Sequence, residues 1–199
     1  MFVVFDIGNV LLRWDPRNLF RDVFADEARM ERFLATACAM EWITHTDIVA
    51  DFSGAVEARA NAFPEFADEL RLFDARWIET IGGPIETNVA LMRRLKAAGR
   101  PVYALSNFAH EKFALCLKRF DFLDEFDARV ISGDVGVVKP NPRIFEILFA
   151  RVGRLPSELL FVDDSPVNVS ASQAVGMSAI RFHPGVDLES ELIARGALG

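Results

Sequence analysis

The sequence opens with MFVVFDIGNVLLRWD (residues 1–15), and this stretch sets the architecture of the chain. Its apolar run, Phe2–Phe5, ends at Asp6, and Gly8 follows two residues later. A short and uniformly apolar run is typical of a strand that is buried on both faces, as in the middle of a parallel sheet. We therefore expect a buried strand over Phe2–Phe5 that places Asp6 at its carboxyl end.

Later segments repeat this pattern of a short apolar run followed by small or polar residues, namely Val102–Leu105, Ala128–Ile131, Leu159–Val162 and Ser178–Phe182. Helical patterns lie between these runs, over Glu86–Ala98, Glu111–Arg119, Pro142–Arg151 and Val167–Val175. Strands that alternate with helices predict a parallel sheet with helices on both faces. The expected fold class is therefore α/β.

Residues 16–83 follow a different pattern, with several helical segments and no convincing strand. Pro64 begins one of these segments, and Gly82-Gly83-Pro84 ends the last. We interpret this stretch as an all-helical insert after the first strand. The predicted division is an α/β core of residues 1–15 and 84–199 with a helical insert of residues 16–83.

The composition suits one globular α/β domain with a smaller insert. The chain has 199 residues, 51% of them apolar, which is enough for a sizeable core. The formal net charge of −7 argues against a nucleic-acid partner, because phosphate backbones bind basic surfaces. Cys38 and Cys116 have no CxxC or zinc-type spacing, so we expect two free, buried thiols.

The sequence also bears on location. The first residues carry Asp6 and lack a basic start, so we expect no signal peptide. No stretch has the ~18–20 uncharged apolar residues that a membrane span requires. We expect a cytoplasmic protein without a membrane partner.

Polar side chains follow the predicted strands at the edge where ligands bind in open α/β sheets. They are Asp6, Ser106, Asn107, Lys139, Asp163 and Asp164. Carboxylates that converge without a cation repel one another, and a hard divalent cation such as Mg²⁺ relieves this repulsion. A lysine adds positive charge for an anionic oxygen, and a serine hydroxyl can donate to phosphoryl oxygens. The set is therefore complete for phosphoryl transfer.

Four short segments in this order resemble the motifs of the haloacid dehalogenase (HAD) superfamily: FDIGNVL (5–11), LSN (105–107), VVKP (137–140) and FVDDS (161–165). The resemblance spans nearly the whole chain. It implies a Rossmann-like core with a helical cap inserted after the first strand, which agrees with the predicted insert. It further implies a phosphatase-like subgroup in which DxG replaces the usual first motif.

The resemblance also implies roles for the residues that bind the phosphoryl group. Asp6 would be the nucleophile that becomes an aspartyl-phosphate. Ser106 would bind the phosphoryl group, with Asn107 beside it. Lys139 would contact both Asp6 and the phosphate. The catalytic set that the resemblance implies is Asp6, Ser106 and Lys139, and the substrate-binding set is Ser106, Asn107 and Lys139.

The resemblance implies a magnesium site at the same place. Asp6 and Asp164 would ligate Mg²⁺ together with the backbone carbonyl of Gly8, and Asp163 would support the metal ligands indirectly. Phosphatases of the superfamily usually carry a second Asp two residues after the nucleophile, which protonates the leaving group and later activates water. Gly8 occupies that position here. Losing a general acid typically costs ~10²–10⁴ in rate.

Three functions stay open at this point. The first is a Mg²⁺-dependent phosphatase that acts on a small phosphorylated metabolite. The second is a 2-haloacid dehalogenase, in which Asp6 would displace halide from carbon without a metal. The third is a non-catalytic phosphate-binding module. The doubled Asp163-Asp164 favours the first, because metal-free chemistry needs no such pair.

The insert carries Trp42, His45 and Asp47, which resemble positions common in this HAD subgroup, where the cap closes over the active site. We interpret Trp14 and Trp42 as packing residues. The sequence leaves the roles of His45 and Asp47 open, and it names neither the substrate nor the oligomeric state.

Overall fold

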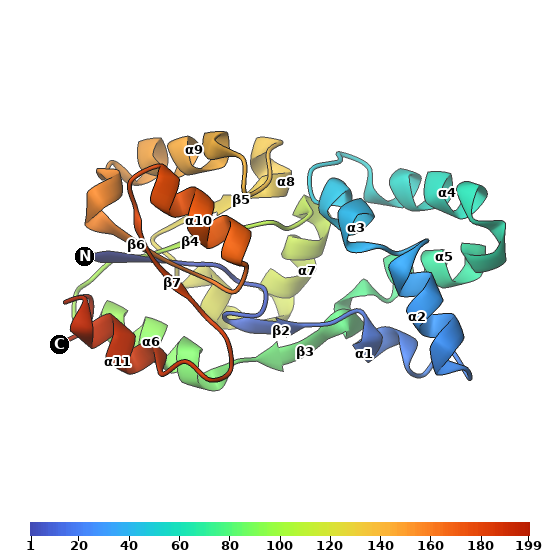
Figure 1. The fold of residues 1–199 in the computed structure, drawn as a ribbon, viewed down its shortest axis with the longest axis horizontal. Helices are drawn as coiled ribbons and strands as arrows, with labels where there is room; N and C mark the ends of the chain where they lie inside the picture. Colours follow the sequence, from blue (N-terminus) through green and yellow to red (C-terminus); the bar gives the residue numbers. More distant parts are fainter.

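The computed structural model describes residues 1–199 and contains a five-stranded parallel sheet. Its strands are β1 (Phe2–Phe5), β4 (Val102–Ser106), β5 (Ala128–Ile131), β6 (Leu159–Asp163) and β7 (Ser178–Arg181), in the spatial order β5-β4-β1-β6-β7. All five lie where the apolar runs predicted them. The α/β fold class with a parallel sheet is confirmed (Figure 1).

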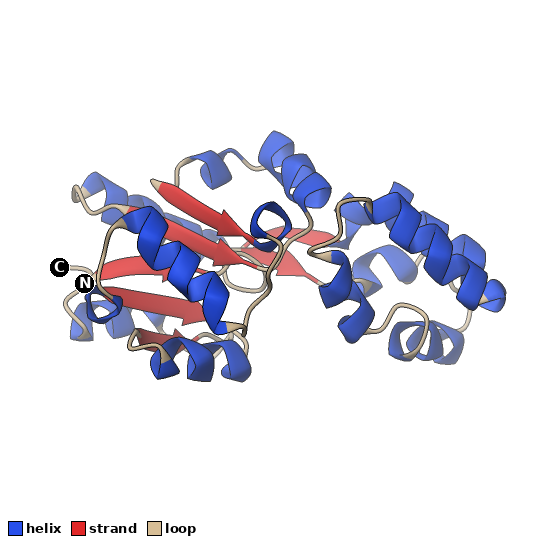
Figure 2. Ribbon diagram, turned by 90° about the horizontal axis from the view of Figure 1, so that it is seen from above, coloured by secondary structure: helices blue, strands red, loops and turns tan.

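Helices cover both faces of this sheet, as Figure 2 shows. One face packs against α6 (Glu86–Ala97), α7 (His110–Arg119) and α11 (Leu188–Ala194), and the other against α9 (Pro142–Val152) and α10 (Pro166–Ala174). Strand β1 alternates between the two layers, because Val3 and Phe5 lie in one apolar cluster and Val4 lies in the other. None of the helices combines the length and the apolar character needed to cross a bilayer.

The helices of residues 17–80 form a separate group beyond the ends of the strands, on the right of Figure 1. They are α1 (Arg17–Phe20), α2 (Glu27–Ala35), α3 (Met40–Thr46), α4 (Phe52–Ala62), α5 (Ala67–Ala75) and the 3₁₀ turns η1 (Pro64–Phe66) and η2 (Trp77–Thr80). Their shared core is rich in phenylalanine. The rings of Phe20 and Phe33 lie 4.7 Å apart, and those of Phe33 and Phe66 lie 5.3 Å apart. Cys38 and Cys116 are free and buried, as predicted.

The prediction that residues 16–83 contain no strand is wrong. Strand β3 (Ile81–Pro84) begins inside this stretch and pairs antiparallel with β2 (Leu12–Trp14). Its sequence, IGGP, has turn residues where strands usually have β-branched ones, so no local pattern marks it as a strand. Ile81–Pro84 forms a strand because it pairs with β2. The exact limits of the core and the cap stay a prediction.

A partly buried ion pair joins the helical group to the sheet domain. Lys112 of α7 donates from Nζ to the Asp74 carboxylate at 2.5 Å and to the Asp74 carbonyl oxygen at 3.1 Å. The same ammonium lies 4.2 Å from the centre of the Phe52 ring. These contacts bring α4 and α5 against α7, and thereby bring the helical group over the ends of the strands.

The segment between β5 and Lys139, which we expected to be a loop, begins with one helical turn, α8 (Ser132–Val135). This turn packs tightly on the start of α7. A Cβ atom added at Gly133 would lie 2.3 Å from the His110 nitrogen and 2.8 Å from the Phe108 oxygen. Both atoms belong to the backbone, so neither can move away without shifting the chain.

Replacing Gly133 with Ala should therefore destabilise the protein by ~1–3 kcal/mol, the usual cost of overpacking. Urea unfolding followed by circular dichroism measures this loss. Gly185→Ala is the control, because a Cβ atom there meets only the His183 side chain, at 3.4 Å, and its effect should stay within ~0.5 kcal/mol. Equal midpoints for wild type and Gly133→Ala would contradict the close approach.

Candidate active site

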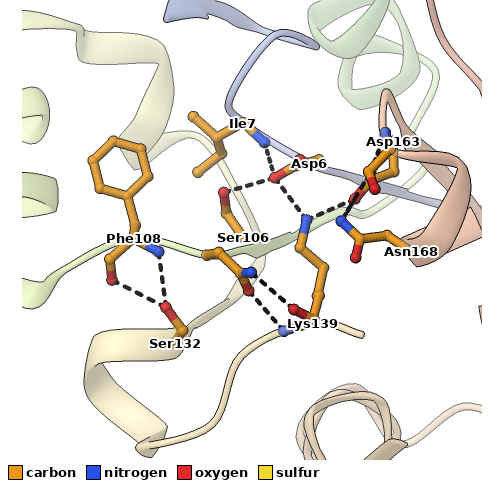
Figure 3. A network of polar contacts seen from close by, with 10 residues as sticks. Asp6, Ile7, Ser106, Phe108, Ser132, Lys139, Asp163 and Asn168 are labelled. Carbon is orange, nitrogen blue, oxygen red and sulfur yellow. Dashed lines mark hydrogen bonds and ion pairs between the residues drawn. The ribbon is translucent and has the colours of Figure 1, made fainter. Parts of the chain in front are cut away.

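The parallel register brings three of the predicted site residues to one edge of the sheet. Phe5, the last residue of β1, lies opposite Ala104 of β4 and Val162 of β6. Asp6 therefore leaves its strand beside the ends of two neighbours, β4 and β6. Those ends carry Ser106 and Asp163, and Lys139 reaches the same point from the segment after α8 (Figure 3).

Asp6 is almost entirely enclosed, with 7% of its surface exposed, and one of its oxygens carries all its hydrogen bonds. Oδ1 accepts from the Ile7 N–H at 2.7 Å and from the Ser106 hydroxyl at 2.6 Å, and it lies 2.9 Å from Lys139 Nζ. Oδ2 makes none of these contacts, yet no fully buried polar atom of the chain lacks a partner. Oδ2 is therefore accessible from the adjoining pocket.

Lys139 lies between two carboxylates. Its Nζ donates to Asp163 Oδ2 at 2.6 Å and contacts Asp6 on the other side, and 2% of the residue is exposed. Asp163 in turn accepts from the Ser165 N–H at 2.8 Å and from the Asn168 side-chain amide at 3.1 and 3.2 Å. Every donor around Asp163 thus belongs to the protein, and its two oxygens are committed to structural contacts.

The pKa values reflect this enclosure. Burial raises the pKa of Asp6 to about 7, even though Lys139 acts to lower it, and the charge of Asp163 raises it further. Burial alone would lower the pKa of Lys139, but the charges of Asp163 and Asp6 outweigh burial and raise it. Lys139 is therefore a permanent cation in this site.

Asn107 lines the pocket and bonds to the backbone of Lys139. Its side-chain oxygen accepts from the Lys139 N–H at 2.7 Å, and its side-chain nitrogen donates to the Lys139 carbonyl at 3.0 Å. Two antiparallel hydrogen bonds therefore join the end of β4 to the backbone that carries the ammonium. A role for Asn107 in substrate binding stays a prediction.

The carboxylates fit one small divalent cation. One oxygen from each of Asp6, Asp163 and Asp164 lies within 4.8 Å of the others. Magnesium–oxygen bonds of ~2.0–2.1 Å place opposite ligands about 4.2 Å apart, so a minor adjustment suffices. Asp163 is already saturated by its donors, which leaves Asp6 and Asp164 as the carboxylates with room for a metal. Burial and the charge of Asp163 raise the pKa of Asp164, as expected where a cation is needed.

A pocket of about 410 Å³ opens directly over these residues. Its floor includes Asp6, Gly8, Lys139 and Asp164 from the sheet edge, and the helical group supplies the roof, which includes Met40, Ile43, Thr44, Asp47, Phe52 and Trp77. A larger and more open groove beside α6 and α11 shares Asn9 and Asp164 with this pocket. That groove includes neither Asp6 nor Lys139, so the smaller pocket is the one that adjoins the candidate catalytic residues.

The structure separates the candidate residues of the insert. Asp47 lines the pocket, whereas His45 is exposed and lies outside its lining. Trp42 is buried against Phe73, with ring centres 6.0 Å apart, in agreement with its interpretation as a packing residue. Trp14, which we also interpreted as packing, is partly buried against the main apolar cluster and lines the pocket as well.

Sequence reasoning missed two supporting residues. Asn168 bonds Asp163 from the first turns of α10. Ser132 accepts from the Phe108 N–H at 2.8 Å and donates to the Asp47 carbonyl at 3.0 Å. Ser132 directly follows β5 at the same sheet edge as Ser106. Its position after a predicted strand is the sequence feature that could have identified it. Asn168 had no comparable signal, because its role depends on how α10 packs.

Comparison with known proteins agrees with this geometry. A family model described as haloacid dehalogenase-like hydrolase matches residues 1–176. The chain belongs to the haloacid dehalogenase-like hydrolases. The four motifs that resembled this family in the sequence are the segments that supply Asp6, Ser106, Lys139 and Asp164 to the site.

Related sequences within and around this family carry several activities. The HAD-like chain is 30% identical over 199 aligned residues to drimenol cyclase drtB of Aspergillus calidoustus, covering 96% of this chain and 35% of that protein. It is 26% identical to sesquiterpene phosphatase astK of Aspergillus oryzae, covering 90% and 88% of the two chains. An (S)-2-haloacid dehalogenase of Pseudomonas fluorescens is 31% identical over 93 residues, covering 47% of this chain and 41% of that protein. The chain thus spans about a third of drtB and most of astK.

Solved structures share the fold of this HAD-like hydrolase. A HAD family enzyme from Bacteroides thetaiotaomicron, in complex with magnesium and inorganic phosphate, has a TM-score of 0.71 at 22% identity and covers 95% of this chain and 97% of its own. The L-2-haloacid dehalogenase from Xanthobacter autotrophicus has a TM-score of 0.67 at 21% identity, with coverages of 100% and 85%. At these identities the likeness establishes the fold.

Proposed function

We propose that this HAD-like hydrolase is a Mg²⁺-dependent phosphatase that cleaves a small phosphate monoester through an aspartyl-phosphate on Asp6. The observation that carries the proposal is the state of the Asp6 carboxylate. Three donors bind Oδ1, which fixes the orientation of the group, while Oδ2 remains open to a pocket. A fixed carboxylate with one free oxygen is suited to nucleophilic attack.

The residues around Asp6 support a two-step reaction. Asp6 forms a bond to phosphorus while the bond from phosphorus to the leaving oxygen breaks, and water then cleaves the aspartyl-phosphate to release phosphate and restore Asp6. Lys139, a permanent cation beside the attacked centre, offsets the negative charge of the phosphoryl oxygens. Ser106 donates its hydroxyl proton to Asp6 Oδ1 and thereby orients the nucleophile.

Magnesium belongs to the proposal because the donor set suits it. Asp6, Asp164 and the Gly8 carbonyl would bind the ion, and Asp163 would support them through Lys139 and Asn168. A bound Mg²⁺ would supply positive charge to the phosphoryl oxygens. The Bacteroides enzyme of the same fold, which was crystallised with magnesium and inorganic phosphate, supports this assignment.

The pocket disfavours the 2-haloacid dehalogenase alternative. A 2-haloacid carries a carboxylate that needs a cationic partner in the site. Lys139 is the one Lys or Arg side chain that lines the pocket, so a haloacid carboxylate bound without a metal would have this single cation, which Asp6 and Asp163 already share. A phosphate ester would have Mg²⁺ in addition. A non-catalytic phosphate-binding module is disfavoured because such a module has no use for a nucleophile with an open oxygen.

The pocket also indicates what kind of phosphate ester fits. Beyond the carboxylates its walls are largely apolar, with Trp14, Ile43, Phe52 and Trp77 among them. Met40 and Val167 line it as well, although they are 56% and 59% exposed. Such walls favour a leaving group with an apolar body. The relative named sesquiterpene phosphatase supports this direction.

Metal removal tests the proposal. We expect hydrolysis of p-nitrophenyl phosphate and hexyl phosphate by the magnesium-loaded protein, and a loss of at least ~100-fold in EDTA that added Mg²⁺ restores. The rate of phosphate release measures the hydrolysis of each ester, its loss in EDTA and its recovery. Chloride release from 2-chloropropionate in EDTA would instead establish dehalogenase chemistry. Phosphate release that continues unchanged in EDTA would refute the metal dependence.

A further inference from the structure

The position that usually carries the general acid is Gly8, so the proposed phosphatase needs an acid from elsewhere. The pocket contains few groups that can exchange a proton. Its titratable side chains are Asp6, Asp47, Lys139 and Asp164. Asp6 is the proposed nucleophile, Asp164 a proposed metal ligand, and Lys139 is paired with two carboxylates. Asp47 is the one that remains without a role.

We propose that Asp47, contributed by the helical group, is the general acid and base of the reaction, an inference that rests on the phosphatase function proposed above. Asp47 lies at the C-terminal end of α3, outside the four motifs that mark the family. It lines the same pocket as Asp6 and Lys139, and the charges of both act on its carboxyl group. The acid would therefore approach from the side of the pocket opposite the sheet.

The backbone at Asp47 is attached to the sheet domain. The Ser132 hydroxyl donates to the Asp47 carbonyl at 3.0 Å, and the Phe108 N–H in turn donates to the Ser132 oxygen at 2.8 Å. Ser132 follows β5, and Phe108 lies just beyond the end of β4. Asp47 is thus positioned by the same strand ends that position Ser106, although it belongs to another part of the chain.

The Asp47 carboxyl group is free of side-chain partners. It forms no ion pair, and its hydrogen bond comes from the backbone N–H of Ala109. Neither of its oxygens is a buried atom without a partner, so the group is accessible from the pocket. Burial raises the pKa of Asp47 to about 7, so both the acid and the carboxylate forms are present near neutral pH.

The space beside Gly8 is open, as this role requires. A Cβ atom at Gly8 would have no heavy atom within 4 Å, and Gly8 does not have a positive φ. The leaving group can therefore lie between Gly8 and the helical group. An acid at Asp47 would reach this space across the pocket, in place of a side chain at Gly8.

The proton balance of the reaction is complete with Asp47 alone. In the first step Asp6 bonds to phosphorus, the phosphorus–oxygen bond to the leaving group breaks, and the Asp47 proton moves to the leaving oxygen to give the alcohol. In the second step the Asp47 carboxylate takes a proton from water as the water oxygen bonds to phosphorus. The bond between Asp6 and phosphorus breaks, phosphate leaves, and Asp47 is protonated again.

Asp47→Asn tests this role through its dependence on the leaving group. p-Nitrophenolate leaves without a proton, whereas an alkoxide does not. We expect kcat/KM for hexyl phosphate to fall by about 100-fold or more, and kcat/KM for p-nitrophenyl phosphate to change by less than about threefold. Because the second step still needs the base, p-nitrophenyl phosphate should give a burst of one p-nitrophenol per site followed by slow turnover.

Two further variants sharpen the result. Glu41→Gln removes an exposed acid of α3 that does not line the pocket. This variant should keep the wild-type kcat/KM for both esters. Adding Gly8→Asp to Asp47→Asn places an acid in open space beside the nucleophile. The double variant should have a kcat/KM for hexyl phosphate at least about tenfold above that of Asp47→Asn.

The outcomes separate this inference from the proposed function. A wild-type protein that hydrolyses neither ester would overturn the phosphatase proposal and the role of Asp47 with it. If the wild type is active and Asp47→Asn loses kcat/KM equally on both esters, the acid role alone is overturned. A structural defect lowers kcat/KM regardless of the leaving group. An Asp47→Asn variant as active as wild type on hexyl phosphate would overturn it as well.

Discussion

Replacing Asp6 with Asn should lower kcat for every phosphate ester by about 10⁴-fold or more, the scale seen when a covalent nucleophile is removed. The amide keeps the size of the side chain but cannot form an aspartyl-phosphate. Acid quenching of wild-type turnover followed by mass spectrometry should find a phosphate on the peptide that contains Asp6, and the variant should carry none. Asp121→Asn, at a side chain that is 92% exposed, is the control and should retain full activity. Turnover in Asp6→Asn, or a phosphate on another residue, would refute the mechanism.

The same substitution should stabilise the metal-free protein at alkaline pH. The pKa of Asp6 is raised to about 7 in the folded state, chiefly by burial, above its ordinary value of 3.8. The folded state therefore binds more protons than the unfolded chain between these values, and the stability of the wild type falls as pH rises through this window. Asp6→Asn removes this contribution. Its unfolding midpoint should exceed that of wild type at pH 8 and approach it near pH 4.

Replacing Lys139 with Met should lower the free energy of unfolding more than Gly133→Ala does, because it leaves Asp6 and Asp163 buried together without a cation. Removing one partner of a buried ion pair typically costs about 3–5 kcal/mol. Lys139 acts to lower the pKa of Asp6, so this pKa should rise above about 7 in the variant, and the loss of stability should be larger at pH 8 than at pH 5. Urea titrations at pH 5 and pH 8 measure this difference.

Lys96→Met is the matched control for this experiment. Lys96 pairs with Asp127 at 3.1 Å, but the two side chains are 30% and 41% exposed. Solvent screens such a pair, and its loss should cost less than about 1 kcal/mol with little dependence on pH. Equal effects of the two substitutions would contradict the view that Lys139 compensates two buried carboxylates.

The principal strands could be found from local patterns. The apolar runs that begin with Phe2–Phe5 are short, lack polar residues and end at polar or small ones, which is the pattern of strands that are buried on both faces. In a parallel sheet, the residues after those runs meet at one edge as a consequence of topology. Asp6, Ser106 and Asp163 could therefore be placed together before any coordinates were known.

Strand β3 could not be found in this way. Its residues, Ile81–Pro84, are typical of a turn, and it becomes a strand because β2 offers hydrogen-bonding groups some seventy positions earlier in the chain. The helical group raised the same difficulty. Nothing in the sequence around His45 and Asp47 told which of the two enters the pocket, because the answer depends on how α3 packs against the rest of the molecule.

Side-chain identity and the alternation of strands with helices were thus enough to predict which residues gather at one edge of the sheet, because both are encoded locally. The division of labour among those groups came from contacts between distant segments. Lys139 is shared between Asp6 and Asp163, Asn107 is bonded to the Lys139 backbone, and Asp47 is attached to Ser132 eighty-five positions away. Hydrogen bonds and burial act through space, so these assignments follow from packing, which a local sequence pattern does not encode.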